Sequence, residues 1–147
     1  MTKDGHIDGA AGPHINGALS QKNPFFTTLV VDGKFSIDGI LEGFLKSEGH
    51  FILRAESAEE ALALTRRFQP DLILLDSQVE GVSGVALLPE LLLEHNLAAV
   101  IMLALTPSVL EAVEAMKWGA VDVMERPLDL KKLKLAVDIQ KALFKVI

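Results

Sequence analysis

A short apolar run that ends in a single carboxylate constrains this chain more than any other feature. Residues 72–75 are all leucine or isoleucine, Asp76 follows them, and the next loop contains Gly81 and Gly84. Such a run is typical of a strand buried on both faces, as the strands of a parallel sheet are. In open α/β sheets, reactive groups lie just beyond the carboxyl ends of the strands. Asp76 is therefore a candidate functional residue, although an aspartate here can equally cap a turn.

The rest of the chain alternates between strand patterns and helix patterns. Apolar runs predict strands at 26–31, 51–53, 71–76, 99–103 and 121–124. Helical periodicity predicts helices after each of them, and the last helix is expected at 129–144. Five strand–helix units in succession predict a flavodoxin-like (βα)5 doubly wound fold, with a five-stranded parallel sheet in the order 2-1-3-4-5.

Three of these helices carry additional signals. The first is expected to have an apolar face made of Ile37, Ile40, Leu41, Phe44 and Leu45. Ser57 and Glu60 form a capping box at the start of the second helix. The fourth is expected to start at Thr106 and Pro107, since proline suits the first turn of a helix.

Composition narrows the class of protein. The 147 residues suffice for one domain with its own core, and the absence of cysteine excludes disulfides and cysteine zinc sites. A net charge of −6 argues against non-specific nucleic-acid binding. The chain has no apolar segment of membrane-spanning length and no signal-peptide pattern, so a cytoplasmic location is expected. Residues 1–24 are expected to form a flexible N-terminal tail before a domain at 25–147.

Polar residues follow three of the predicted strands. Asp32 follows the first strand, Asp76 the third and Arg126 the fifth. In the predicted strand order the first and third strands are neighbours, so Asp32 and Asp76 should face one another with Arg126 beside them. Two carboxylates and a cation suit either a site for a divalent metal and a phosphate, or a buried ion-pair cluster.

Residues 25–147 resemble the receiver domain of two-component response regulators. The resemblance rests on LVVD at 29–32, on PDLILLD at 70–76 and on EAVEAMKWGAVDVMERPLDLKKL at 111–133. The last segment is similar to receivers that precede transcriptional-activator domains. The resemblance implies that Asp76 accepts a phosphoryl group from a histidine kinase. It also implies that Mg²⁺ is held by acids after the first strand, by Asp76 and by the backbone carbonyl of Gln78.

The chain departs from the family pattern at four positions. Gly33 stands where the family has a second acid, Ala104 where it has Ser or Thr, Val123 where it has an aromatic residue, and Arg126 where it has lysine. We therefore expect Mg²⁺ binding to be weak or absent, with Asp32, Asp76 and Gln78 as the remaining ligands.

The departures favour a pseudo-receiver: a signalling module that is not an enzyme and acts through protein–protein interaction. The alternative is a working receiver that a histidine kinase phosphorylates on Asp76. Two neighbouring residues leave further alternatives open. Lys34 is either a fixed counter-charge for the acids or a solvated loop lysine, and Thr106 is a less favoured substitute for the missing hydroxyl at Ala104.

In the family the usual partner surface is formed by the fourth helix, the fifth strand and the fifth helix. Here that surface is expected to contain Trp118, Lys131 and Lys134 and to bind a protein partner or a second copy of the chain. Tryptophan is enriched at the centres of such interfaces, but Trp118 could equally fold back onto Pro127 or the last helix. No direct binding of nucleic acid or membrane by this domain is expected.

Overall fold

The structure, a computed structural model of the chain, describes residues 25–32 and 39–146, with side chains up to residue 143. The predicted tail at 1–24 and the residues Gly33, Lys34 and Ile37 lie outside the described residues. Within the described part, no helix is long and apolar enough to cross a membrane.

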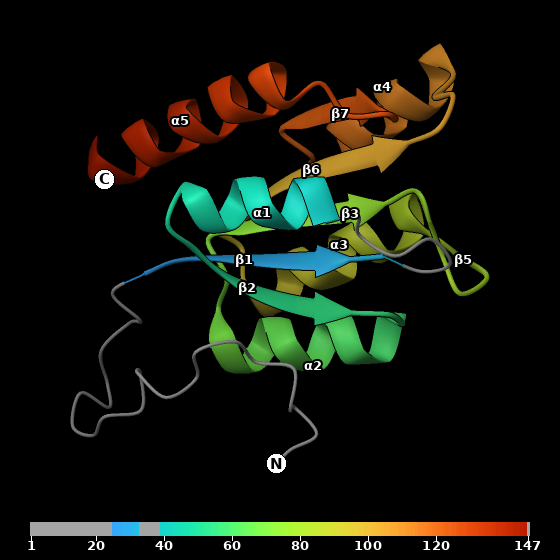
Figure 1. Cartoon of the computed structure of the whole chain (residues 1–147). Helices are drawn as coiled ribbons and strands as arrows, with labels where there is room; N and C mark the ends of the chain where they lie inside the picture. The colour runs from blue at the N-terminus through green and yellow to red at the C-terminus, as the bar shows by residue number, and fades with distance from the viewer. Residues whose placement is uncertain (1–24, 33–38, 147) are drawn as a thin grey trace.

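Five parallel strands form the central sheet (Figure 1). They are β1 Phe26–Val31, β2 His50–Ala55, β3 Leu72–Asp76, β6 Ala99–Ala104 and β7 Asp122–Glu125. Their order is β2-β1-β3-β6-β7, and every pairing between neighbours is parallel. The predicted flavodoxin-like fold and strand order are confirmed, because the two additional strands, β4 Gln78–Val79 and β5 Val82–Ser83, lie outside this sheet.

Helices cover both faces of the sheet (Figure 1). α1 Gly39–Ser47 and α5 Leu130–Val146 pack on one face, and α2 Ala58–Phe68, α3 Gly84–Glu94 and α4 Val109–Lys117 pack on the other. Successive residues of a strand point to opposite faces, so each buried strand feeds two separate cores. Leu72 and Leu74 belong to the core under α1 and α5, whereas Ile73 and Leu75 belong to the other core.

The structure contains a two-stranded hairpin after β3 that the sequence did not predict. β4 Gln78–Val79 pairs antiparallel with β5 Val82–Ser83. The two residues between them, Glu80 and Gly81, both have positive φ, at 48° and 81°. This is the conformation of a type I′ hairpin turn, which usually carries asparagine or aspartate before the glycine. Because this position holds glutamate, the sequence did not indicate the turn.

The capping box of α2 is confirmed on one side, since the backbone N–H of Glu60 donates to Ser57 Oγ at 3.1 Å.

The predicted start of the fourth helix is wrong. Ser108 is the N-cap of α4, because its hydroxyl accepts from the N–H of Glu111 at 3.0 Å and satisfies a first-turn donor.

The predicted apolar face of the first helix is wrong at one residue. Leu41 and Leu45, one turn apart, are buried against the sheet, while Ile40 is 72% exposed. Neighbouring residues on a helix point about 100° apart, so a helix that seats Leu41 and Leu45 directs Ile40 away from the sheet.

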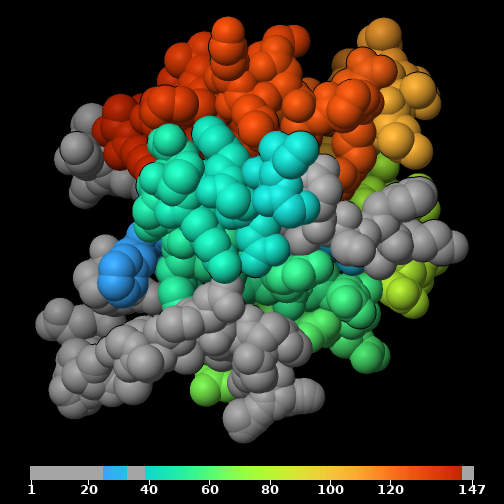
Figure 2. Space-filling view, viewed as in Figure 1, coloured from blue at the N-terminus to red at the C-terminus, as the bar shows by residue number. Residues whose placement is uncertain are grey.

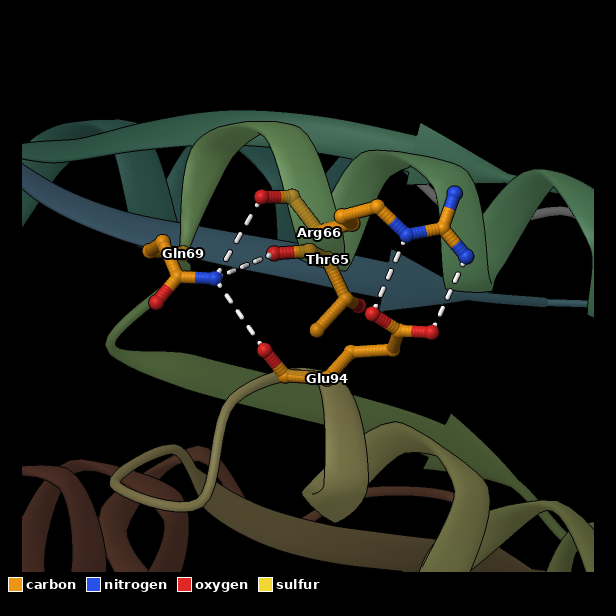
Figure 3. Close-up of polar contacts among 4 residues, drawn as sticks. All are labelled: Thr65, Arg66, Gln69 and Glu94. Atoms are coloured by element: carbon orange, nitrogen blue, oxygen red, sulfur yellow. Dashed lines mark hydrogen bonds and ion pairs between the residues drawn. The ribbon is translucent and has the colours of Figure 1, made fainter.

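A polar cluster joins the ends of α2 and α3 on the surface (Figure 3). Arg66 forms two hydrogen bonds with the Glu94 carboxylate, from Nε at 3.0 Å and from Nη2 at 2.9 Å. Gln69, in the left-handed conformation at the end of α2, donates from its side chain to the carbonyl oxygen of Glu94 at 3.2 Å. This cluster holds two helices together and lies outside the strand-end region where the predicted site residues are.

His50 is a buried titratable group at the start of β2. Its Nδ1 lies 2.7 Å from Thr28 Oγ1, and its ring packs edge-on against Phe26. Its Nε2 is buried and has no hydrogen-bond partner among the described residues. Burial, together with the nearby charge of Lys141, lowers the pKa of His50 from 6.5 to about 4.

We predict that His50 makes the fold sensitive to mild acid. The unfolded chain protonates this residue below about pH 6.5 and the folded chain only near pH 4, so its contribution to stability falls as the pH drops through that window. When this contribution is lost completely, the free energy of unfolding falls by about 3 kcal/mol. Urea unfolding of the wild type and of His50→Gln at pH 7 and pH 4.5 measures it. The variant should lose less stability between the two pH values, and equal losses would contradict the assignment.

Candidate functional site

Asp76 lies at the carboxyl end of β3, as predicted, and is 8% exposed. Its Oδ1 accepts a hydrogen bond from the backbone N–H of Gln78 at 3.1 Å. Its Oδ2 lies 3.7 Å from Nη2 of Arg126. The carboxylate therefore has a partner on each oxygen and is held at the end of the strand.

The loop after Asp76 is fixed by close backbone packing. A Cβ added at Gly84 would lie 2.5 Å from the carbonyl oxygen of Asp76, so no other residue fits there without a shift. The N–H of Gly84 donates to the carbonyl of Ser77 at 2.8 Å, and the N–H of Ser77 donates to that of Leu103 at 2.9 Å. The sequence prediction noted Gly84 as a loop residue, and its contact with Asp76 shows why glycine is needed.

Asp32 directly follows β1 and is 4% exposed. Its backbone N–H donates to Ala55, but neither carboxylate oxygen has a hydrogen-bond partner among the described residues. Burial raises the pKa of Asp32, the positive charge of Arg126 opposes this effect, and the negative charge of Asp76 adds to it. Asp32 is thus a buried acid whose main opposing charge comes from another strand end.

Arg126 directly follows β7, and its backbone N–H donates to the carbonyl of Ala104 at 2.8 Å. Its side chain is 18% exposed and contacts Asp76. The structure therefore brings together Asp32, Asp76 and Arg126, the three strand-end residues that the sequence grouped.

The remaining candidate residues are Ala104, Thr106, Val123 and Gln78. Ala104 is buried at the end of β6 and offers no hydroxyl, and Thr106 lies in the exposed segment beyond it. Val123 is half-buried and packs against the core under α2, α3 and α4. Gln78 is exposed in β4, with its N–H turned to Asp76.

The described residues supply only part of the Mg²⁺ site that the family pattern implies. Magnesium requires near-octahedral oxygen coordination. The two carboxylate oxygens of Asp32 have no hydrogen-bond partner among the described residues and could act as metal ligands. However, no group of three acidic or histidine side chains in the described ranges is placed to hold a metal ion. Beside Asp76 stands a guanidinium, which supplies positive charge without a metal.

The chain belongs to the family of response regulator receiver domains. The model of that family matches residues 28–138, well over half of the chain and the whole sheet-forming region except the first residues of β1. The resemblance inferred from the strand-end motifs is thereby confirmed.

Among the curated relatives, the transcriptional regulatory protein ZraR of Escherichia coli (strain K12) is 35% identical over 110 residues, which are 75% of this chain and 25% of ZraR. The nitrogen assimilation regulatory protein NtrX of Azorhizobium caulinodans is 35% identical over 107 residues, 71% of this chain and 24% of NtrX. The chain spans about a quarter of the length of these relatives.

Solved receiver domains share the fold. The receiver domain of NtrX from Brucella abortus is 33% identical, with a TM-score of 0.70 over 77% of this chain and 96% of that domain. A signal receiver domain assigned to a Luxo repressor protein of Vibrio parahaemolyticus is 27% identical, with a TM-score of 0.74 over 82% of this chain and 92% of that domain.

A groove of about 700 Å³ follows β7, the edge strand of the sheet, on the side of Arg126 and α5. Sequence reasoning missed it, because it depends on how α5 packs beside the strand. Its lining is Pro107, Asp122, Val123, Met124, Glu125, Arg126, Pro127, Asp129, Lys132, Leu135, Ala136 and Ile139. We call the surface formed by α4, β7 and α5, with this groove in it, the α4–β7–α5 face.

Two residues predicted for this face already have partners in the chain. Trp118, which is 47% exposed, donates from its indole Nε1 to Glu114 Oε1 at 3.1 Å, so it contacts its own helix. Lys134 binds the carboxylates of Glu48 at 3.1 Å and Asp138 at 3.2 Å. Lys134 therefore ties α5 to the end of α1, which lies beside it on the surface (Figure 2). Lys131 is exposed.

We predict that Asp32→Asn stabilises the fold at neutral pH. A raised pKa means that the ionised acid is disfavoured in the folded state, so the stability linked to its protonated form is lost as the pH rises above its unfolded value. Removing the charge should add on the order of 1 kcal/mol to the free energy of unfolding, measured by urea at pH 7. Glu125→Gln, at an exposed acid nearby, is the control and should change little.

Proposed function

We propose that this receiver domain is a pseudo-receiver: it passes on a signal by binding protein through the α4–β7–α5 face, and not by Mg²⁺-dependent phosphorylation of Asp76. Its role is that of a signalling module and not of an enzyme, and we place it in the cytoplasm. The relatives named as transcriptional regulators suggest that its output is the control of transcription.

The contrast between the site and the face is the observation that supports this proposal. At the site, the hydroxyl position is Ala104, the second acid position is Gly33, and Arg126 stands beside Asp76. Nine of the fifteen large apolar side chains that are exposed in the described part of the chain belong to this face. From α4 and β7 to α5 they are Val109, Leu110, Val113, Met116, Trp118, Val121, Leu135, Ile139 and Leu143.

A second copy of the chain is the partner that we propose to test first. The groove contains acids, among them Asp122 and Glu125, and bases, Arg126 and Lys132. In a two-fold dimer the same patch meets itself, so the acids of one copy can oppose the bases of the other. Apolar side chains beside such charges, such as Leu135 and Ile139, supply the area that is removed from water.

One observation favours the alternative, a working phospho-acceptor. Asp76 keeps the position at the end of β3, and a cation stands beside it, as phosphoryl transfer to a carboxylate requires. A histidine kinase is the partner in that case. The two functions differ in whether Asp76 gains a phosphoryl group.

We predict that incubation with acetyl phosphate and Mg²⁺ adds no phosphoryl group to the wild type. The reason is that the chain has Gly33 where the family has a second acid and Ala104 where it has a hydroxyl, and that no group of three metal-binding side chains occurs within the described ranges. Intact-mass spectrometry measures the adduct, with Asp76→Asn as the matched control and circular dichroism as the check of folding. An adduct that forms in the wild type and is lost in Asp76→Asn would establish the alternative.

We predict that Leu135→Glu with Ile139→Glu abolishes self-association and leaves stability within about 0.5 kcal/mol, since both side chains are exposed. Sedimentation velocity over a range of protein concentrations measures the dimer. Leu93→Glu, at an exposed leucine of α3, is the matched control and should leave the dimer intact. A wild type that stays monomeric at all concentrations, or a dimer that survives the double substitution, would contradict the proposed interface.

A further inference from the structure

We infer that the guanidinium of Arg126 takes the place of a divalent cation as the counter-charge of two buried acids, Asp32 and Asp76, and so closes the site to Mg²⁺. This inference deepens the proposed function and rests on it, because it says what neutralises the site in place of a metal.

Arg126 is held close to Asp76. Its Nη2 lies 3.7 Å from Asp76 Oδ2, on the carboxylate that a metal in this site would have to share. Its backbone is fixed by the hydrogen bond to Ala104 at 2.8 Å, and most of its side chain is buried. The cation is thus built into the end of β7.

Asp32 is the second acid on which the charge of Arg126 acts. Both of its carboxylate oxygens are buried and lack hydrogen bonds within the described part of the chain. A buried acid of this kind requires an opposing charge. The strongest one acting on it comes from Arg126. One guanidinium therefore serves two acids that stand on different strands.

Arginine differs chemically from lysine, the residue that the family has at this position. Its guanidinium keeps its charge at every accessible pH and is planar, whereas a lysine ammonium is a compact charge on a flexible stem that loses its proton more readily when buried. A divalent ion between Asp32 and Asp76 would stand against this fixed positive charge in a site shielded from water, where charge repulsion is strong. The competing interpretation is an ordinary ion pair that stabilises the fold and has no effect on metal affinity.

The test compares Mg²⁺ affinity, by calorimetry, in the wild type, Arg126→Met and Arg126→Gln. Both variants remove the charge, and glutamine keeps a donor for Asp76. We expect both to bind Mg²⁺ at least tenfold more tightly than the wild type. Adding Asp76→Asn should remove the gain. Arg66→Met is the matched control, since Arg66 is also an arginine bound to a carboxylate, in the α2–α3 cluster of Figure 3, and should leave Mg²⁺ affinity unchanged.

Unchanged Mg²⁺ affinity in folded Arg126→Met and Arg126→Gln would overturn the inference. If neither variant folds, the melting temperature of the wild type still tests the inference. The inference expects that MgCl₂ raises its melting temperature no more than NaCl of equal ionic strength, and a rise of several degrees that Asp76→Asn abolishes would refute it. These measurements use no phosphodonor, so they fail or succeed independently of the phosphorylation test on which the proposed function depends.

Discussion

The burial of β3 on both faces is the constraint on which the rest of the structure depends. The side chains of Leu72 and Leu75 and of the two residues between them are fully buried, so no polar group is tolerated along the strand. Polar residues are confined to its ends. At the start, Asp71 accepts a hydrogen bond from the N–H of Thr27 at 2.8 Å. At the other end, Asp76 meets Arg126. The site lies where the dry sheet first allows charge.

The same constraint explains how much the sequence could predict. Strand order and the grouping of Asp32, Asp76 and Arg126 follow from the alternation of elements and from the rule that parallel strands end at one edge. The hairpin turn at Glu80 escaped prediction because its residue type is unusual for that turn. The pairing of Lys134 with Glu48 and the groove beside β7 escaped because they depend on how α5 packs against the rest of the chain.

Charge at the site is balanced differently from charge at the α2–α3 cluster. Arg66 and Glu94 form an exposed pair, one cation with one acid, that is joined by two hydrogen bonds. At the strand ends, one arginine faces two acids, and the carboxylate of Asp32 has no hydrogen bond among the described residues. An arrangement that costs stability in this way is typical of functional positions, where the local rules of folding are broken.

Arg126 also connects the site to the surface. It pairs with Asp76 on one side and lines the groove of the α4–β7–α5 face on the other. The family pattern has a hydroxyl and an aromatic side chain at two positions in this region, and here those positions hold Ala104 and Val123. A partner bound in the groove, as proposed above, would contact the side chain that faces both acids. Binding at the proposed interface and the charge balance of the site would then be coupled through this one residue.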